Sequence, residues 1–421
     1  MKAGKLLPLN TGGKLRSYHI LRHLPALHAV TFLSYYGGLR DRSYEAELQR
    51  AMPGSIIVHD PTIEAKGVQR YISYARCLPD SIPYSVRSFK VAYVQHLLSS
   101  RAFTSKFDIA VCDFLASAVN FPTNASIPTV LFQHNVESLL WKRRAQFASD
   151  LWCGLIARTE CAKMTRYEHE QVRRFHDIFA VSEQDREVLA AMSGTANITV
   201  IPTGADLQSY AYDSENRRVD PLVIFSGSMD WEPNIDAVEY FSGEIWPHVL
   251  ARIPGARFRI VGRDPDHRVR KLVSPSIAVT GTVDSMMEHL RPAAVLVVPL
   301  RIGAGTRIKI YEGMAMGKAI VSTTLGAEGL DVHDGHDIFL SDHPRRFAER
   351  VVDLLLDEKL RNECGRQAAI TAHKHSWNSV AQIFSEALQR VLRAKQDLFA
   401  PCAAPANFMT RFNNKAVESR L

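Results

Sequence analysis

The residues best suited to chemistry lie close together within residues 299–330, in the stretch PLRIGAGTRIKIYEGMAMGKAIVSTTLGAEGL. Gly303 and Gly305 allow the backbone to turn tightly and to come close to a ligand. Thr306 is placed to cap a helix, because the apolar spacing from residue 307 to residue 316 is helical. This order predicts a glycine-rich loop that runs into the start of a helix.

The start of a helix behind a glycine loop suits an anion, because free N–H groups and the positive end of the helix dipole point at the ligand. Arg307 and Lys309 add two side-chain charges at the same end. Glu312 follows roughly one and a half turns into the helix and can accept hydrogen bonds from a pair of hydroxyls. Phosphates at the helix start and a diol deeper in the site describe a nucleotide. The alternative interpretation is a surface turn followed by a solvated helix face.

The loop must be positioned by buried strands, and the sequence has one on either side, AAVLVVPL and AIVST. Apolar runs of this kind are typical of buried parallel strands. Further strand candidates are HAVTFLS, SIIVH, DIAVC, PTVLFQ, IFAV and ITVIP in the first half, and PLVIFSG, ARFRIVG, SIAVTG and DIFLS in the second. Because helical patterns separate these runs, the sequence predicts an α/β protein with two Rossmann-like domains and parallel sheets.

The composition is that of a basic globular protein of 421 residues with a formal net charge of +7. The excess is spread over both halves, which argues against a nucleic-acid partner. It suits anionic substrates and allows peripheral contact with an acidic membrane. The six cysteines form no CxxC pair, as expected of reduced cytosolic thiols, and no apolar run reaches the roughly 18 residues that span a bilayer. We expect a cytoplasmic protein, at most peripheral at the cytoplasmic face of the inner membrane.

The ordered set of glycine loop, Arg307, Lys309 and Glu312 resembles the donor-nucleotide motif of retaining glycosyltransferases of the GT-B fold, in particular family 4 (group 1). The form GxGTRxKxxEGMAxG is most similar to a branch associated with exopolysaccharide biosynthesis. The resemblance implies that Arg307 and Lys309 grip the donor diphosphate during catalysis and that Glu312 holds the ribose, with Gly303, Gly305 and Thr306 in the same site. Ala304 replaces the first glutamate of the family motif, so recognition of the sugar is expected to be built differently here.

In the first half, TGGKLRSYHIL forms a second glycine loop before a helix, with Lys14 and Arg16 in the first turn. A turn without function is the alternative. The resemblance places this loop across the cleft from the first, which assigns Gly12, Gly13 and Lys14 to the donor. PTVLFQHNVESLL leaves His134 at the carboxyl end of a strand, where doubly wound sheets bind ligands.

A histidine at this strand end lies close to the donor sugar in the resembled family. His134 is therefore assigned to sugar contact or catalysis, and a general-base role is chemically open. The alternative is a histidine that only holds its loop by hydrogen bonds.

Three residues at strand ends in the second half are expected to complete the donor site. Ser228 follows Gly227 where the family usually carries a cation, so it can offer only a neutral hydrogen bond, and Arg307 and Lys309 must neutralise more of the diphosphate. Arg263 and Val283 are expected to border the nucleotide base.

The domain prediction assigns residues 1–205 to the first domain, 206–220 to a linker and 221–375 to the second domain. Residues 376–396 are expected to form a helix that crosses back to the first domain, as in GT-B proteins, and residues 397–421 a tail. The first central strand is expected to be missing or a remnant, because KLLPL is short and contains a proline.

The segment 82–107 carries four cations and no acid. A packed helix with solvated cations is the preferred interpretation, and the alternative is an acceptor-side surface for a lipid-linked glycan or the membrane.

These features predict a hexosyltransferase or other glycosyltransferase that moves a sugar from a nucleoside diphosphate sugar to a hydroxyl acceptor, a polysaccharide or a polyprenyl-linked glycan. The resemblance implies retention of configuration. No cofactor is expected, and no Asp-x-Asp suits a metal-bound diphosphate. Two alternatives stay open: a nucleotide-sugar epimerase of the same fold, and a non-catalytic nucleotide-sugar-binding protein.

Overall fold

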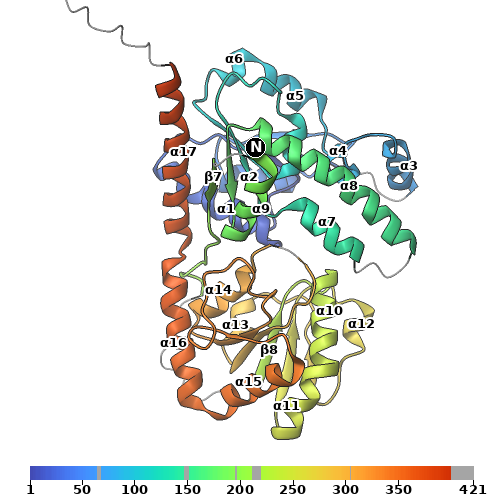
Figure 1. Cartoon of the computed structure of the whole chain (residues 1–421), viewed down its shortest axis with the longest axis vertical. Coiled ribbons are helices and arrows are strands. Elements are labelled where there is room, and N and C mark those ends of the chain that lie inside the picture. Colours follow the sequence, from blue (N-terminus) through green and yellow to red (C-terminus); the bar gives the residue numbers. More distant parts are fainter. Residues whose placement is uncertain (64–67, 147–150, 195–196, 211–219, 304, 400–421) are drawn as a thin grey trace, which may run out of the picture.

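The computed structural model describes residues 1–63, 68–146, 151–194, 197–210, 220–303 and 305–399. Within them it has two α/β domains, each built on a parallel sheet. Figure 1 shows the first domain, coloured blue to green, above the second, coloured yellow to orange, with the last helix running beside both. The predicted fold class, two Rossmann-like domains with parallel sheets, is confirmed.

The first domain alternates strands with helices as the apolar runs predict. Its strands are β1 (Lys2–Ala3), β2 (Leu33–Tyr36), β3 (Ile56–His59), β4 (Ala110–Asp113), β5 (Thr129–Phe132), β6 (Asp177–Ala180) and β7 (Ile198–Val200). Its helices are α1 (Gly12–His23), α2 (Arg42–Ala51), α3 (Val68–Cys77), α4 (Tyr84–Arg87), α5 (Ala92–Ser99), α6 (Arg101–Thr104), α7 (Glu137–Gln146), α8 (Leu151–Arg174) and α9 (Glu183–Ser193).

The second domain repeats the scheme. Its strands are β8 (Leu222–Ser226), β9 (Arg257–Val261), β10 (Ile277–Val279), β11 (Val295–Val298), β12 (Ala319–Ser322) and β13 (Phe339–Leu340). Its helices are α10 (Glu232–Tyr240), α11 (Trp246–Arg252), α12 (His267–Arg270), α13 (Met286–Leu290), α14 (Ile308–Ala315), α15 (Pro344–Leu356) and α16 (Glu358–Lys374). The chain then continues into α17 (Trp377–Phe399).

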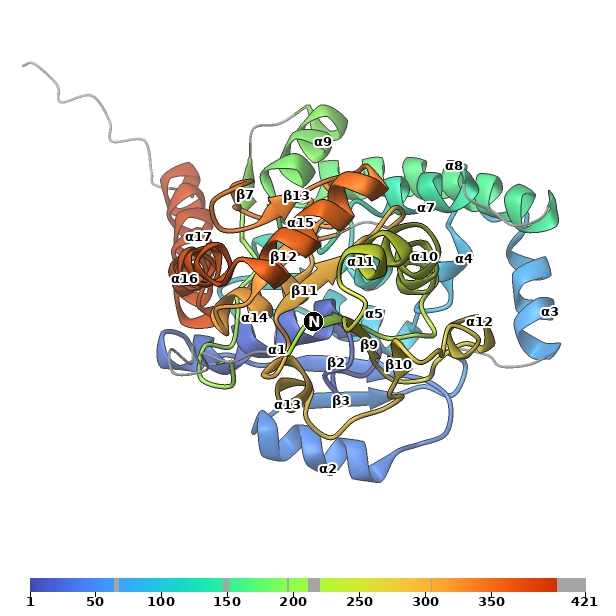
Figure 2. The same ribbon diagram turned by 90° about the horizontal axis from the view of Figure 1, so that it is seen from below.

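In both sheets, successive strands are added first on one side of the central strand and then on the other, so the strand order reverses there. The strand order is β3-β2-β1-β4-β5-β6-β7 in the first and β10-β9-β8-β11-β12-β13 in the second. Figure 2 shows β3 and α2 at one edge of the first domain, and β7 and α9 at the other. Ligands of such sheets bind beyond the carboxyl ends of the strands at the reversal, here β1 and β4 in one domain and β8 and β11 in the other.

The central strand of the first domain is very short. β1 pairs Lys2 with Ser34 of β2 and with Asp113 of β4. On the amino side of β1, between β2 and β4, lies a cavity of about 310 Å³ whose lining includes Phe32, Leu33 and Val111. Two neighbouring strands therefore continue past β1 with an apolar space between them.

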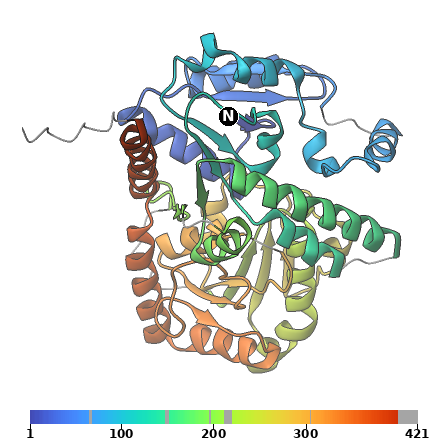
Figure 3. The same cartoon turned by 45° about the horizontal axis from the view of Figure 1, so that its top comes forward.

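The last helix ties the two domains together. In Figure 3 the red α17 lies beside the blue α1, and Val380 and Phe384 of α17 share a buried cluster with Ile20 and Leu24 from the end of α1. α17 thus crosses back to the first domain and continues three residues beyond the predicted end at residue 396. Of the predicted linker and tail, residues 211–219 and 400–421 lie outside the described residues.

The chain passes between the domains at two adjacent places. The Ala205 N–H donates to the His375 carbonyl at 2.8 Å, and the Trp377 N–H donates to the Ala205 carbonyl at 3.3 Å. Gly204 is packed so closely that an added Cβ would lie 2.7 Å from the Trp377 ring. Within the described ranges, no helix combines the length and the apolar character needed to cross a membrane.

Candidate functional site

The predicted glycine loop leaves the carboxyl end of β11 and lies against the first domain. Gly303 and Gly305 have positive φ values of 114° and 84°, which L side chains rarely adopt. A Cβ at Gly305 would lie 2.1 Å from Oδ1 of Asn135 in the first domain. Glycine is therefore required at residue 305 both by backbone conformation and by the approach of the other domain. Ala304 lies outside the described residues.

The expected cap of the following helix is wrong. α14 begins at Ile308 with Arg307 at the N-cap position, where no side chain caps the helix. The Thr306 hydroxyl instead contacts Thr203 of the first domain at 2.6 Å and accepts a short hydrogen bond from Arg16. Contacts across the domain boundary have taken the place of the local cap, so the first N–H groups of α14 receive no side-chain cap.

Arg307 and Lys309 lie at the start of α14, as predicted, and both are partly withdrawn from water. Arg307 is 6% exposed and donates to the Gly305 carbonyl. Burial lowers the pKa of Arg307 to about 10. The Lys309 ammonium donates to the carbonyl of Ser226, the last residue of β8. Lys309 therefore brings its charge to the reversal point of the second sheet, where the sequence has no cation after Gly227.

Lys309 and Glu312 both have pKa values close to neutral pH. Burial lowers the pKa of Lys309 to about 7, reinforced by Arg307 and opposed by Glu312. Burial raises the pKa of Glu312 to about 7, against the effect of Lys309. Withdrawing an ammonium or a carboxylate from water disfavours its charged form. An anion beside Lys309 would favour its protonated form again.

The other predicted residues of the second domain lie at neighbouring strand ends. The Ser228 hydroxyl donates to Asp230, and the Arg263 guanidinium lies 3.8 Å from Asp230. Val283 is partly buried against the core of the second domain. The structure thus brings Ser228 and Arg263 together through Asp230, a residue that the sequence analysis did not single out.

In the first domain, α1 begins at Gly12 itself, so Gly12 and Gly13 lie in its first turn and not in a loop before it, and Arg16 lies in the second turn and not in the first as expected. Thr11 caps the helix by accepting from the Lys14 N–H at 3.4 Å. A Cβ on Gly13 would lie 2.3 Å from the ring of Phe114, and one on Gly12 would lie 3.4 Å from Ile308 of the second domain. Gly13 is therefore required by close packing on Phe114, and Gly12 faces the start of α14.

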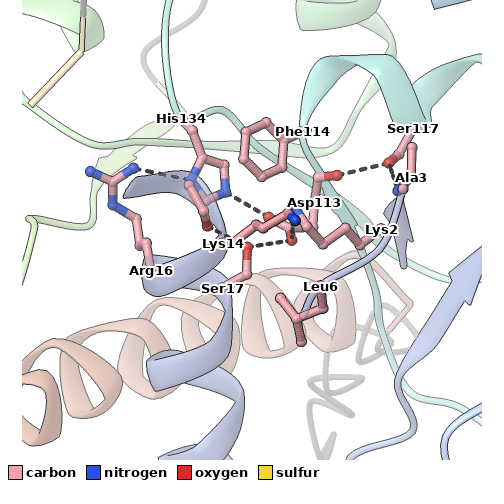
Figure 4. Close-up of polar contacts among 12 residues, drawn as sticks. Lys2, Ala3, Leu6, Lys14, Arg16, Ser17, Asp113, Phe114, Ser117 and His134 are labelled. Carbon is pink, nitrogen blue, oxygen red and sulfur yellow. Dashed lines mark hydrogen bonds and ion pairs between the residues drawn. The ribbon is translucent and has the colours of Figure 1, made fainter. Parts of the chain in front are cut away.

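His134 is buried in a polar network at the carboxyl ends of β4 and β5 (Figure 4). Its Nε2 lies 2.6 Å from Oδ1 of Asp113 and its Nδ1 lies 3.0 Å from Nη1 of Arg16. The ring stacks on Phe114 at 3.8 Å. Asp113 also accepts from the Ser17 hydroxyl at 2.6 Å and pairs with Lys2 at 3.5 Å.

These partners fix the protonation of His134. Burial alone would raise the pKa of Asp113, but Lys2 and His134 together hold it below its usual range, so Asp113 is ionised. Burial lowers the pKa of His134 to about 4 despite Asp113. The neutral ring donates from Nε2 to the carboxylate and accepts at Nδ1, since an arginine can only donate. Neither ring nitrogen is available to take up a proton, so this arrangement does not suit the general-base role left open above.

Arg143 forms a second link between the domains. From α7, its Nη1 donates to the carbonyl of Gly303 at 2.5 Å, and its two terminal nitrogens pair with Glu328 of the second domain at 2.8 and 2.9 Å. A bidentate pair of this kind is directional as well as attractive. The glycine loop is therefore held by the first domain on one side through Arg143 and on the other through Arg16.

Sequence reasoning missed Asp113, Arg143 and Glu328. Asp113 had a usable signal, because it directly follows the apolar run DIAVC and therefore stands at a strand end, as His134 does. Arg143 and Glu328 had none, since they are 185 residues apart and meet only across the two domains.

Fold and site together define the class. The chain has the two parallel-sheet α/β domains of GT-B glycosyltransferase structures. Residues 220–357 match the family model described as "Glycosyl transferases group 1". This match covers most of the second domain, which contains the glycine loop and α14.

Individual relatives agree with this class. A phosphatidyl-myo-inositol mannosyltransferase of Mycolicibacterium smegmatis is 27% identical over 195 residues, or 43% of this chain and 49% of that protein. The chain spans about half or less of the length of the curated relatives it matches.

Two solved structures are similar over nearly the whole chain, at identities that show the fold alone. Sucrose-phosphate synthase from Thermosynechococcus elongatus superposes with a TM-score of 0.68 at 15% identity, over 93% of this chain and 97% of that one. HepE of Anabaena in complex with UDP-glucose superposes with a TM-score of 0.62 at 14% identity, over 92% and 98%.

Proposed function

We propose that this protein is a glycosyltransferase that moves a sugar from a nucleoside diphosphate sugar to a hydroxyl acceptor, with retention of configuration and without a metal ion. The observation that carries the proposal is the start of α14 at the boundary between the domains, where Arg307 and Lys309 stand at a helix end without a side-chain cap, with Glu312 one turn further in. Each of these groups has a matching part in a nucleotide sugar: two cations and a helix end for the diphosphate, and a carboxylate for the ribose hydroxyls.

The chemistry follows from where charge develops. When the bond between the sugar and the diphosphate breaks, negative charge accumulates on the leaving phosphate. We propose that Arg307, Lys309 and the uncapped N–H groups of α14 stabilise this charge, with the two cations exchanging the carbonyls of Gly305 and Ser226 for phosphate oxygens. Removing one preorganised contact of this kind costs about 2.7–4 kcal/mol, a 10²–10³-fold loss in kcat.

His134 is proposed to contact the transferred sugar rather than to remove a proton. Its ring is neutral, stacked on Phe114 and bonded through both nitrogens, which suits a rigid wall. Gly12, Gly13 and Lys14 would face the donor from the first domain, and Ser228, Arg263 and Val283 would border the nucleotide from the second.

The donor and acceptor are proposed by class. HepE, which shares the fold, binds UDP-glucose, and this makes uridine nucleotides the first to test. The phosphatidyl-myo-inositol mannosyltransferase is named for a lipid acceptor, which fits a polyprenyl-linked glycan or growing polysaccharide here. The motif form supports a place in family 4 and in its exopolysaccharide branch, working in the cytoplasm with peripheral contact at the inner membrane. Val91 and Val94 of the basic segment are buried, so membrane contact is proposed only for its solvated cations.

The test is calorimetric titration with nucleoside diphosphates, UDP and GDP first, on the wild type and on Glu312→Gln. One nucleotide is expected to bind the wild type and to bind Glu312→Gln at least tenfold more weakly. Glu349→Gln is the matched control, because Glu349 lies exposed on α15. With the matching nucleotide sugar, Arg307→Ala should then lose 10²–10³ in turnover.

Failure of every nucleotide to bind the folded wild type, or wild-type turnover in Arg307→Ala, would overturn the proposal. Binding without transfer or hydrolysis would instead favour a non-catalytic nucleotide-sugar-binding protein.

A further inference from the structure

Arg16 occupies an unusual position for a buried cation. It lies on the second turn of α1, is 3% exposed, and reaches three separate parts of the site. Its Nη1 meets His134 at 3.0 Å, and its Nη2 donates to Thr203 at 2.5 Å and to Thr306 across the cleft. All three partners are neutral groups.

Its charge is not balanced by any carboxylate at ion-pair distance within the described part of the chain. Its Nε, also buried, has no hydrogen-bond partner among the described residues. A buried charge without a partner is strongly unfavourable, and Arg307 and Lys309 add further positive charge at the same end of α14. Asp185 and Asp113 raise the pKa of Arg16 only from beyond ion-pair distance, so a bound anion would be its first direct charged partner.

The orientation of the guanidinium shows which edge would meet that anion. Nε and Nη2 share one edge of the planar group, and this edge forms the two parallel hydrogen bonds of a bidentate pair with a carboxylate or phosphate. Here Nε is unpaired and Nη2 is held only by hydroxyls, while Nη1 on the other edge is fixed by His134. An anion that displaced the two hydroxyls from Nη2 would therefore pair with this edge without loss of the His134 contact.

We propose that Arg16 is a diphosphate ligand supplied by the first domain, which exchanges the hydroxyls of Thr203 and Thr306 for two phosphate oxygens when the donor enters the cleft. This inference rests on the proposed function. It explains how the chain compensates for Ser228, where the sequence offers no cation after Gly227, since a cation from the opposite domain takes over that charge.

The experiment compares UDP with UMP by calorimetry on the wild type, Arg16→Gln and Arg16→Lys. UMP lacks the phosphate that Arg16 is proposed to hold. Arg16→Gln is expected to weaken UDP binding about ten- to a hundredfold and to change UMP binding less than twofold. Arg16→Lys, which keeps the charge but not the bidentate edge and serves if Arg16→Gln fails to fold, should weaken UDP binding by a smaller factor. Arg22→Gln is the matched control, because Arg22 is exposed on the same helix.

A role of Arg16 in holding the fold alone gives a different result. It would lower the affinities for UDP and UMP by the same factor, or leave both unchanged, and either outcome overturns the inference. If the wild type binds UDP and Glu312→Gln weakens that binding while Arg16 substitutions leave the UDP-to-UMP ratio unchanged, only the role of Arg16 fails. If the wild type binds no nucleotide, the proposed function fails with it.

Discussion

At pH 8, binding of UDP is expected to take up close to one proton per protein molecule, and the proton goes to Lys309. Burial lowers the pKa of Lys309 to about 7, so at pH 8 about nine-tenths of these side chains are neutral in the free protein. A diphosphate beside the amine restores the charged form. Because only molecules with Lys309 protonated and Glu312 ionised are competent to bind, the apparent affinity should fall about threefold from pH 7 to pH 8 and approach a tenfold fall per unit above that.

Below pH 7, UDP binding should release a proton instead of taking one up, because burial raises the pKa of Glu312 to about 7. At pH 6 about nine-tenths of Glu312 is protonated in the free protein. Acceptance of the ribose hydroxyls by the carboxylate then releases a proton, while Lys309 is already charged. Binding is therefore strongest near pH 7 and is coupled to uptake above it and to release below it.

Calorimetry in buffers of equal pH and different ionisation enthalpy measures these protons directly. The arginine of Lys309→Arg keeps its charge throughout this pH range, so this variant should take up no proton at pH 8 when UDP binds. Glu312→Gln should release no proton at pH 6. Titration of the phosphates of UDP is common to all three proteins and cancels in the differences. A wild type with no buffer dependence at pH 8, or undiminished uptake in Lys309→Arg, would refute this account of Lys309.

Three further predictions follow from particular contacts. His134 has a pKa of about 4 in the folded protein, below its ordinary 6.5, so its contribution to stability is complete above pH 6.5 and is lost as the pH falls toward 4. In urea unfolding, the stability advantage of the wild type over His134→Gln should shrink by about 2–3 kcal/mol between pH 7 and pH 4.5, and a constant difference would contradict a buried neutral ring. Gly305→Ala should abolish UDP binding, because the added Cβ would strike Asn135. The control Gly335→Ala, at a similar φ but in open space, should lose only about 1 kcal/mol of stability and keep its affinity for UDP, and equal affinities in the two variants would count against a loop held by the first domain. Four apolar residues added before Met1 should pair with β2 and β4, fill the cavity between them and raise Tm by a few degrees, since each buried side chain contributes about 1.5–3 kcal/mol against the entropy of ordering the segment. Four Gly and Ser residues added at the same place are the control, and an equal Tm for both proteins would show that the cavity does not accept a strand.

The fold was predictable because its signal is local. Each of the apolar runs singled out in the sequence overlaps one of the strands β2–β13, since buried parallel strands must be apolar on both faces. Carboxyl ends of such strands meet at one edge of a sheet, which is why Lys309 and His134 were placed at the right ends of their domains.

Contacts between the domains were not predictable from the sequence. Thr306 has the right residue type and position for an N-cap, yet its hydroxyl contacts Thr203 and Arg16, which are 103 and 290 residues away. No local pattern encodes such distances. The availability of the His134 nitrogens could not be judged either, because it depends on Asp113 and Arg16 arriving from different elements.

The two adjacent chain crossings at Ala205 and His375 have a mechanical consequence. Because the two crossings lie side by side, the chain joins the domains at one place, which can act as a hinge. α7 lies on the opposite side of the molecule from α17 (Figure 1), so the ion pair between Arg143 of α7 and Glu328 acts far from the two crossings. A weak force has its greatest torque there. Separation of the domains on that side should therefore depend on this salt-sensitive pair and on the contact of Arg16 with Thr306, more than on the apolar contact between α1 and α17 beside the two crossings.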